Sequence, residues 1–139
     1  MFDTIVVGID GSPPANRAVA HAIDLAHRYD AELHVIYVVD TSRYGEPALS
    51  NVEMLLHELE EEGSDLLEEV EDRARSQSVD VSTRCCHGKP ATEIVEFADQ
   101  TNADVIVLGH RGVSHPESGH VGSVTERVVR HGGHPVFVV

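Results

Sequence analysis

The sequence predicts an α/β fold: a single domain over residues 1–139, built on a parallel sheet of five strands with helices on both faces. Three observations lead to this prediction. Short apolar segments alternate along the chain with segments whose apolar residues recur at helical spacing. The first short segment, Thr4–Ile9, is β-branched and almost continuously apolar, as in a strand buried on both faces. A chain of 139 residues is long enough to bury one such core.

The expected strands share a short length and a high content of valine, isoleucine and leucine. They are Thr4–Ile9, Leu33–Val39, Val79–Cys86, Asp104–Leu108 and Pro135–Val139. The third also contains the polar Ser82 and Arg84, so we expect it at an edge of the sheet, whereas the apolar fourth is expected to be central.

The expected helices are marked by start signals and by apolar residues three or four positions apart. Ser12 followed by Pro13 predicts an N-cap and a first helical residue. Half of the residues from Glu53 to Asp72 are acidic, which indicates the solvated face of a helix rather than an acidic docking site. Gly63 inside this segment predicts a bend or a break. Two further helices are expected at Ala91–Asp99 and Ser123–Arg130, and a loop at Thr41–Ser50.

The charge of the chain excludes some functions. Lys and Arg total 10 against 24 Asp and Glu, which gives a formal net charge of −14. Because phosphate backbones repel such a chain, we expect binding neither to nucleic acid nor to an anionic membrane. Lys89 is the single lysine. This composition is typical either of a halophilic-type surface that holds water and counterions in a salty cytoplasm or of an ordinary acidic protein.

The sequence also indicates the compartment. No apolar run reaches the roughly 18 residues that span a bilayer. The N-terminal segment, with Asp3 and Asp10, does not resemble a signal peptide, so a cytoplasmic protein is expected. Cys85 and Cys86 are adjacent, and a disulfide between neighbours is strained. We therefore expect both thiols to be reduced and partly buried rather than to form a redox switch.

A glycine-rich segment follows the fourth expected strand. It reads Gly109-His-Arg-Gly112, then nine residues, then Gly122-Ser123-Val124 at the start of a helix. Glycines let the backbone approach a ligand, and the N-terminus of a helix favours an anion. The segment therefore predicts a phosphate-binding loop. The alternative is a structural loop in which Ser123 and Glu126 form a capping box.

A carboxylate follows the first expected strand directly. In open parallel sheets a ligand binds beyond the carboxyl ends of the strands, which here directs attention to the loops after Ile9, Val38 and Leu108. Asp10 lies at the first of these and could accept a hydrogen bond from ribose or adenine, or help hold a metal ion. The alternative is that Asp10 only shapes the Asp-Gly-Ser turn.

Histidines are concentrated near the same loop. Side chains of His110, His115 and His120 could ligate Zn²⁺ or Ni²⁺, but their spacing matches no standard ligand pattern, so chance clustering is the simpler explanation. His131 and His134 are expected to interact with the dipole of the last helix.

Segments along almost the whole chain resemble the universal stress protein family. The spacing Gly109-x2-Gly112-x9-Gly122-Ser is similar to the ATP-binding signature of that family. Further segments that match in order are IVVGIDGS, HVIYVVD, GKPATEIVEFA, DVIVLGHRG and GSVTERVVRHGGHPVFVV. The nine-residue insert VSHPESGHV departs from the family, whose members usually carry several large aliphatic residues just before Gly-Ser.

The resemblance implies a Rossmann-like fold of the adenine nucleotide alpha hydrolase type, with strand order 3-2-1-4-5 and dimers formed by antiparallel pairing of the last strands, here Pro135–Val139. It also implies that ATP or AMP binds with Mg²⁺ or Mn²⁺ bridging phosphate oxygens. Gly8 and Asp10 would lie beside the adenosine, and the backbone of Val38 beside adenine. The ribose and phosphates would be wrapped by Leu108, Gly109, His110, Arg111, Gly112, Val113 and Ser114, and the phosphate tail would be bound by Gly122, Ser123 and Val124. From its charge alone, Arg111 could pair with phosphate or with a surface acid.

Three functional hypotheses remain. The leading one is an ATP-binding regulatory module in stress response, a label that comes only from the resemblance. The second is a weak ATPase in which Asp10 and a metal ion order a water molecule, and the third is a nucleotide-independent scaffold dimer. The chain has no P-loop, no G-x-G-x-x-G after the first strand, no G-x-S-x-G and no C-x-x-C, so we assign no catalytic residue and do not expect fast turnover.

Overall fold

The computed structural model describes residues 2–43, 50–111 and 121–139. Its strands are β1 (Thr4–Ile9), β2 (Glu32–Asp40), β3 (Val81–Gly88), β4 (Val105–Leu108) and β5 (Val136–Val138). Its helices are α1 (Pro13–Tyr29), the 3-10 turn η1 (Thr41–Arg43), α2 (Ser50–Ser76), α3 (Pro90–Thr101) and α4 (Ser123–His131).

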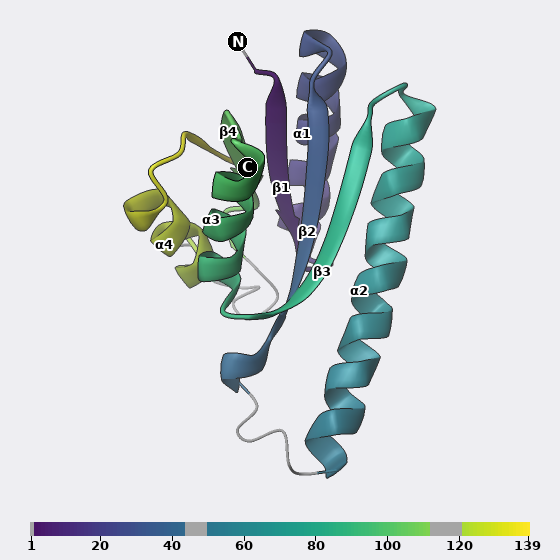
Figure 1. Ribbon diagram of the computed structural model, residues 1–139, viewed down its shortest axis with the longest axis vertical. Helices are drawn as coiled ribbons and strands as arrows, with labels where there is room; N and C mark the ends of the chain where they lie inside the picture. The colour runs from purple at the N-terminus through teal and green to yellow at the C-terminus, as the bar shows by residue number, and fades with distance from the viewer. Residues whose placement is uncertain (1, 44–49, 112–120) are drawn as a thin grey trace.

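The five strands form one parallel sheet in the order β3-β2-β1-β4-β5 (Figure 1), so the predicted fold and strand order are confirmed. β1 lies in the middle, where Val6 pairs with His34 of β2 on one side and with Ile106 of β4 on the other. The polar β3 forms one edge, as predicted, and β5 forms the other.

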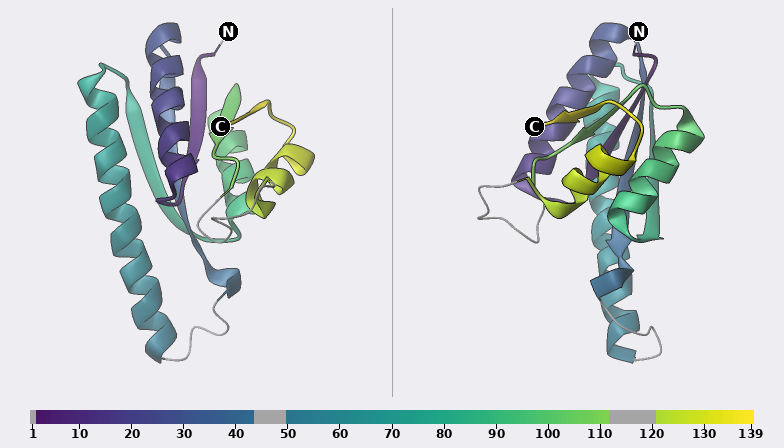
Figure 2. Two further views of the ribbon diagram at one scale, coloured as in Figure 1. Left: turned by 180° about the vertical axis from the view of Figure 1, so that it is seen from behind. Right: turned by 90° about the vertical axis from the view of Figure 1, so that its left-hand side faces the viewer.

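Helices cover both faces of the sheet, as Figure 2 shows from behind and from the side. Alternate residues of a strand point to opposite faces. Accordingly, Ile5 and Val7 of β1 pack in the core under α1 and α2, whereas Val6 packs under α3 and α4. All three side chains are fully buried, which explains why this segment has no polar alternation.

The predicted start of α1 is confirmed. Ser12 is the N-cap, and its Oγ accepts a hydrogen bond from the N–H of Ala15 at 3.3 Å. Pro13 begins the helix, where its missing N–H costs nothing. The side chain of Ser12 is buried, so this hydrogen bond also satisfies its hydroxyl in the core.

Some predicted boundaries were wrong. β3 begins at Val81 rather than Val79, because the N–H of Val79 donates to the carbonyl of Ala74 and completes the turn that ends α2. The expected loop after β2 begins with η1, and α2 already begins at Ser50; residues 44–49 lie outside the described residues.

The expected break at Gly63 was also wrong, because α2 runs without interruption from Ser50 to Ser76. The glycine instead makes room for an aromatic ring. A Cβ atom at Gly63 would lie 2.3 Å from Cδ1 of Tyr37 on β2. Helix and strand therefore approach closely at this point, and the first turns of α2 extend beyond the carboxyl ends of β2 and β3 (Figure 1).

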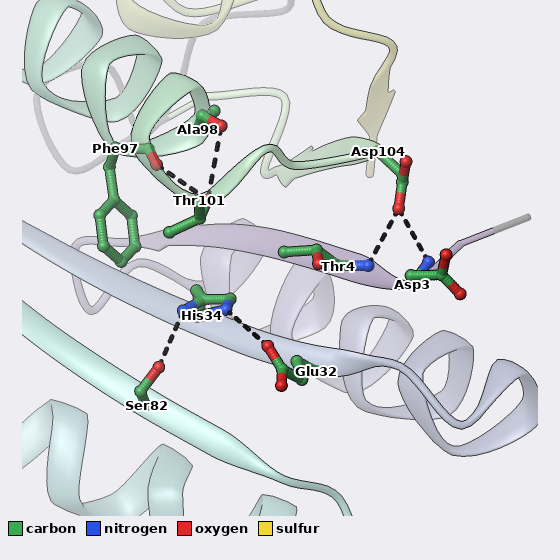
Figure 3. Close-up of polar contacts among 9 residues, drawn as sticks. All are labelled: Asp3, Thr4, Glu32, His34, Ser82, Phe97, Ala98, Thr101 and Asp104. Atoms are coloured by element: carbon green, nitrogen blue, oxygen red, sulfur yellow. Dashed lines mark hydrogen bonds and ion pairs between the residues drawn. The ribbon is translucent and has the colours of Figure 1, made fainter.

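The amino end of the sheet is held by a carboxylate. Oδ2 of Asp104, just before β4, accepts hydrogen bonds from the N–H groups of Asp3 at 2.8 Å and Thr4 at 3.0 Å (Figure 3). These bonds tie the start of β1 to the start of β4. Nearby, His34 of β2 contacts Ser82 of β3, with 2.8 Å between Nδ1 and Oγ.

The prediction for His134 was wrong. Its Nε2 lies 2.7 Å from Oδ1 of Asp99, and its Nδ1 lies 3.1 Å from the carbonyl oxygen of Ala103. Through these two contacts the ring links the chain after α4 to α3 and to Ala103, just beyond the end of α3. Of the two histidines, His131, the last residue of α4, stands where the helix dipole favours a cation. Across the described ranges, no helix combines the length and the apolar character needed to cross a membrane.

Candidate functional site

A pocket of about 230 Å³ lies at the carboxyl ends of β1, β2 and β4, where the sequence directs attention. The strand order reverses between β1 and β4, which in open parallel sheets is the position of ligand sites. Elements from both faces of the sheet contribute to its wall. The lining residues are Gly8, Ile9, Asp10, Ala15, Ile36, Tyr37, Val38, Val39, Asp40, Leu59, Glu62, Pro90, Ile94, Leu108, Gly109, Arg111, Gly122, Ser123, Val124 and Thr125.

Most of the residues expected at the nucleotide line this pocket. They are Gly8, Asp10, Val38, Leu108, Gly109, Arg111, Gly122, Ser123 and Val124. His110 does not line it, because its ring is directed elsewhere: Nδ1 lies 2.9 Å from the carbonyl oxygen of Val139. Gly112, Val113 and Ser114 lie outside the described residues.

The start of α4 forms one wall of the pocket. Gly122 is the N-cap, and the first turn of α4 has no side-chain cap. The capping box, the alternative interpretation of this segment, is not formed, because Ser123 is already helical and Glu126 pairs with Arg130 instead, at 3.0 Å. The N–H groups of the first turn have no acceptor within the helix, and the helix dipole makes this end positive. The wall therefore presents hydrogen-bond donors that suit an anion.

Not every N–H group at this end is free. The N–H of Gly122 donates to the carbonyl of His110 at 2.5 Å, so this amide is engaged within the protein. The buried Thr125 hydroxyl donates to the carbonyl of Gly109 at 2.8 Å. Both bonds tie the start of α4 to the chain that leaves β4, and they hold the donors of Ser123 and Val124 beside it.

Two of the glycines stand where packing within the protein leaves little room for a side chain. A Cβ at Gly109 would lie 2.8 Å from the carbonyl carbon of Pro14, at the start of α1. At Gly8 it would lie 2.9 Å from Cδ2 of Leu108 and 3.1 Å from Cδ1 of Ile94. These glycines bring the elements of the site together whether or not a ligand is present.

Asp10 fits both of its interpretations. Its Oδ1 accepts a hydrogen bond from the N–H of Ser12 at 2.9 Å, which shapes the turn before α1. The same carboxylate lines the pocket, and as an oxygen donor it suits Mg²⁺ or Mn²⁺.

Sequence reasoning missed a second carboxylate in an equivalent place. Asp40 ends β2 as Asp10 follows β1, and Asp40 also lines the pocket. Its Oδ1 accepts hydrogen bonds from the N–H of Ser42 at 3.0 Å and the Ser42 hydroxyl at 2.5 Å. The rule that directed attention to Asp10, that ligands bind beyond the carboxyl ends of parallel strands, could also have found Asp40.

The apolar walls were missed as well. Ile36 and Tyr37 come from β2, Ile94 from α3, and Leu59 from α2. Ile36 and Ile94 belong to the core under α3 and α4, and nothing in their local sequence distinguishes them from other core residues. Leu59 and its neighbour Glu62 reach the pocket only because α2 extends past the sheet.

Charge is divided across the pocket. On the side of β2 and α2 stand the carboxylates of Asp40 and Glu62, with Asp10 at the end of β1. On the side of β4 and α4 stand Arg111 and the donors of the α4 N-terminus. A ligand with hydroxyl groups at one end and negative charge at the other matches this arrangement.

The cluster of three histidines, for which the sequence favours chance over a metal site, is described only in part. His110 donates its backbone N–H to the carbonyl of Val139 at 2.8 Å, the same oxygen that its ring contacts. His115 and His120 lie outside the described residues. Among the residues that are described, no three His, Cys, Asp or Glu side chains converge as a metal site would require.

Comparisons with known proteins identify the family. The sequence model of the universal stress protein family matches residues 1–139. A universal stress protein of Methanocaldococcus jannaschii is 41% identical over 140 residues, which cover 100% of this chain and 82% of the relative. The solved structure of universal stress protein UspA from Lactobacillus plantarum superposes with a TM-score of 0.92 at 32% identity, over 99% of this chain and 97% of that one. A universal stress protein solved in complex with cAMP gives a TM-score of 0.69 at 27% identity, over 99% and 96% of the two chains. The chain therefore belongs to the universal stress protein family.

Proposed function

We propose that this chain binds an adenine nucleotide, ATP in the first place, and acts as a nucleotide-responsive regulatory module in stress response. The observation that carries the proposal is the division of the pocket into a carboxylate side and a side with Arg111 and the uncapped start of α4. The binding of cAMP by a structural neighbour supports the same class of ligand.

The lining suggests how the nucleotide lies. In this proposal the backbone of Val38 contacts adenine, and Ile36 and Ile94 supply apolar surface in the same pocket. Asp10 accepts a hydrogen bond from a ribose hydroxyl. The phosphates then reach the N–H groups at the start of α4 and the guanidinium of Arg111, which forms charge-assisted hydrogen bonds with phosphate.

A divalent cation fits the same arrangement. Mg²⁺ is commonly held by one or two carboxylates together with the phosphates of a nucleotide. Holding this ion, with phosphate oxygens as the other ligands, is the alternative role that we assign to Asp10. The chain has a net charge of −14, which repels the negative phosphates of a nucleotide. A bound divalent cation would neutralise part of the phosphate charge and reduce this repulsion.

The first test is the nucleotide content of the purified protein. We expect denaturation at high KCl to release stoichiometric nucleotide, identified by chromatography and mass spectrometry. Added ATP with Mg²⁺ at 100 times its Kd should stabilise the emptied protein by about 2.7 kcal/mol. An empty protein whose melting temperature ATP does not shift would contradict nucleotide binding and favour the scaffold hypothesis.

Arg111 provides the sharper test. Arg111→Gln should weaken ATP about tenfold, the usual cost of a lost charge-assisted hydrogen bond, and leave adenosine binding unchanged. Arg127→Gln is the matched control, since Arg127 is exposed on α4 and outside the pocket. Equal ATP affinity in all three proteins would assign Arg111 to a surface ion pair instead.

Single-turnover assays on Asp10→Ala test the ATPase hypothesis, which fails if the rate of ATP hydrolysis is unchanged.

We also propose a homodimer through the last strand. β5 is an edge strand with exposed apolar side chains: Phe137 is 40% and Val138 38% exposed. An uncovered apolar edge is a ready site for strand pairing, and a second copy of β5 would cover it.

A further inference from the structure

A second groove lies between α1 and α2, next to the proposed nucleotide pocket. Its volume is about 350 Å³. Ile9 and Val70 are buried in its floor and Leu66 is half-buried, so the floor is apolar. The residues that line it are Ile9, Gly11, Asn16, Arg17, Ala20, Leu66, Glu69, Val70 and Arg73.

The rim of this groove carries two arginines from different helices. Arg17 of α1 and Arg73 of α2 are both exposed, and neither forms an ion pair with any residue that the structure describes. Three other arginines pair with a carboxylate one helical turn away. These pairs are Arg28–Asp24 at 2.9 Å, Arg75–Glu71 at 2.6 Å and Arg130–Glu126 at 3.0 Å.

The charge of the groove is opposite to that of the chain. Glu69 is the one acidic residue in its lining, against two guanidinium groups. The groove therefore carries one net positive charge in a protein with a net charge of −14. Glu69 stands one helical turn before Arg73 yet does not pair with it among the described contacts. The cationic groups remain available to an external anion.

We propose that this groove binds a small organic monocarboxylate, a ligand with one negative headgroup on an apolar body. Arg17 and Arg73 would hold the carboxylate, because guanidinium groups match its geometry and bind it through paired hydrogen bonds. The apolar body would lie on Ile9, Leu66 and Val70, where burial from water favours it. One net positive charge selects a monoanion over a nucleotide polyphosphate.

The groove and the nucleotide pocket share a wall. Ile9 lines both, and the chain that follows it packs on α2: at Gly11, where φ is +82°, a Cβ would lie 3.2 Å from Cδ1 of Leu66. The proposal does not depend on nucleotide binding, because none of the groove's charged residues lines the pocket. In NMR spectra the amide signal of Gly11 reports on the groove and that of Gly122 on the pocket.

The test is a titration of the ¹⁵N-labelled protein with 1-naphthoate, followed by two-dimensional NMR. We expect saturable shifts of the amide signals of Gly11, Ala20 and Val70. The double variant Arg17→Gln/Arg73→Gln should weaken binding about tenfold or more, since it removes both charged donors. Arg127→Gln, which removes an exposed arginine elsewhere, should bind as the unmodified protein does.

Two further probes separate the parts of the proposal. Neutral 1-naphthamide keeps the apolar body without the charge, and inorganic phosphate supplies charge without the body; both should bind at least about tenfold more weakly than 1-naphthoate. Equal binding of either probe, unchanged affinity in the double variant, or shifts confined to Gly122 would overturn the proposal. Circular dichroism of the double variant, expected to be unchanged, distinguishes loss of binding from loss of fold.

Discussion

Gly63 and Tyr37 show how much one contact can change the meaning of a residue. A glycine in the interior of a helix costs about 1 kcal/mol relative to alanine, and for this reason it predicts a break. In the structure the ring of Tyr37, which is buried at 6% exposure, occupies the space that a side chain at Gly63 would fill. The glycine thus places α2 against β2 and beside the pocket at the carboxyl ends of β1, β2 and β4, which Tyr37 lines.

Gly63→Ala should therefore destabilise the protein, by about 1–3 kcal/mol in urea unfolding, although helix propensity alone favours alanine. Ser64→Ala, at the neighbouring exposed position, is the control and should be neutral or slightly stabilising. Adding Tyr37→Ala should remove most of the penalty for alanine at position 63, because the clash is with that ring. A stabilising effect of Gly63→Ala would contradict the close approach of α2 and β2.

The two cysteines differ in their surroundings, because neighbours on a strand face opposite sides of the sheet. Cys85 is exposed and Cys86 is partly buried, with Sγ 3.8 Å from Oε2 of Glu93, so the prediction that both are partly buried was wrong for Cys85. Burial and then the negative charge of Glu93 raise the pKa of Cys86 to about 11. Although Cys85 is exposed as a residue, partial desolvation of its thiol, and then the charge of Glu60, raise the pKa of Cys85 as well. Because the thiolate is the reactive form, both thiols should be slow nucleophiles at neutral pH.

In a Cys85→Ser protein, alkylation of Cys86 by iodoacetamide at pH 7 should be about 100-fold slower than that of glutathione. The rate should rise about tenfold per pH unit until the pH approaches 11. Mass spectrometry of timed samples measures both the alkylation rate at pH 7 and its dependence on pH. Rapid labelling at pH 7 would contradict the raised pKa and reopen the redox interpretation.

At the scale of elements, the start of β1 is tied to the start of β4 by one side chain. Asp104 accepts two backbone hydrogen bonds, from Asp3 and Thr4, and these bonds hold its pKa below the ordinary value. A carboxyl whose folded-state pKa is lowered stabilises the fold above its unfolded-state pKa. That stability is lost as the pH falls through the folded-state value.

Asp104→Asn should accordingly lower the stability of the protein at pH 7, because the amide oxygen accepts the same bonds without a charge. The difference from the unmodified protein should shrink as the pH falls below about 4, where the unfolded chain takes up the proton. Denaturant unfolding across this range measures it. Asp65→Asn, an exposed change on α2, controls for net charge, and a pH-independent difference at Asp104 would contradict the mechanism.

At the scale of the whole molecule, the two edges of the sheet have different character. β3 carries polar and charged side chains, which discourage pairing with another strand. β5 is short and apolar, and its Phe137 meets the ring of His21 of α1, with 5.5 Å between ring centroids. The two copies of the proposed dimer would therefore meet at β5, beyond β4 and the Arg111 side of the proposed nucleotide pocket.

Phe137→Glu should convert the proposed dimer to a monomer, because a charged side chain would be desolvated at the interface. The mass in solution, measured by light scattering during size-exclusion chromatography at high KCl, should halve. Val129→Glu is the control: Val129 is 52% exposed on α4, away from the strand edge. A lower mass in the Val129→Glu control alone would place the dimer interface elsewhere. An unchanged mass in both variants would contradict a dimer formed through β5.

The sequence by itself determined the fold class, the strand order through family resemblance, and the start of α1. It also determined that a ligand pocket forms at the carboxyl ends of the strands. These follow from local patterns, because apolar periodicity and capping depend on residues close together in the chain. The tertiary structure decided what joins distant residues: Tyr37 against Gly63, the ring of His110 on Val139 rather than in the pocket, and the arginine groove between α1 and α2. Such contacts depend on how helices and strands approach one another, and the spacing of residues within one segment does not contain that information.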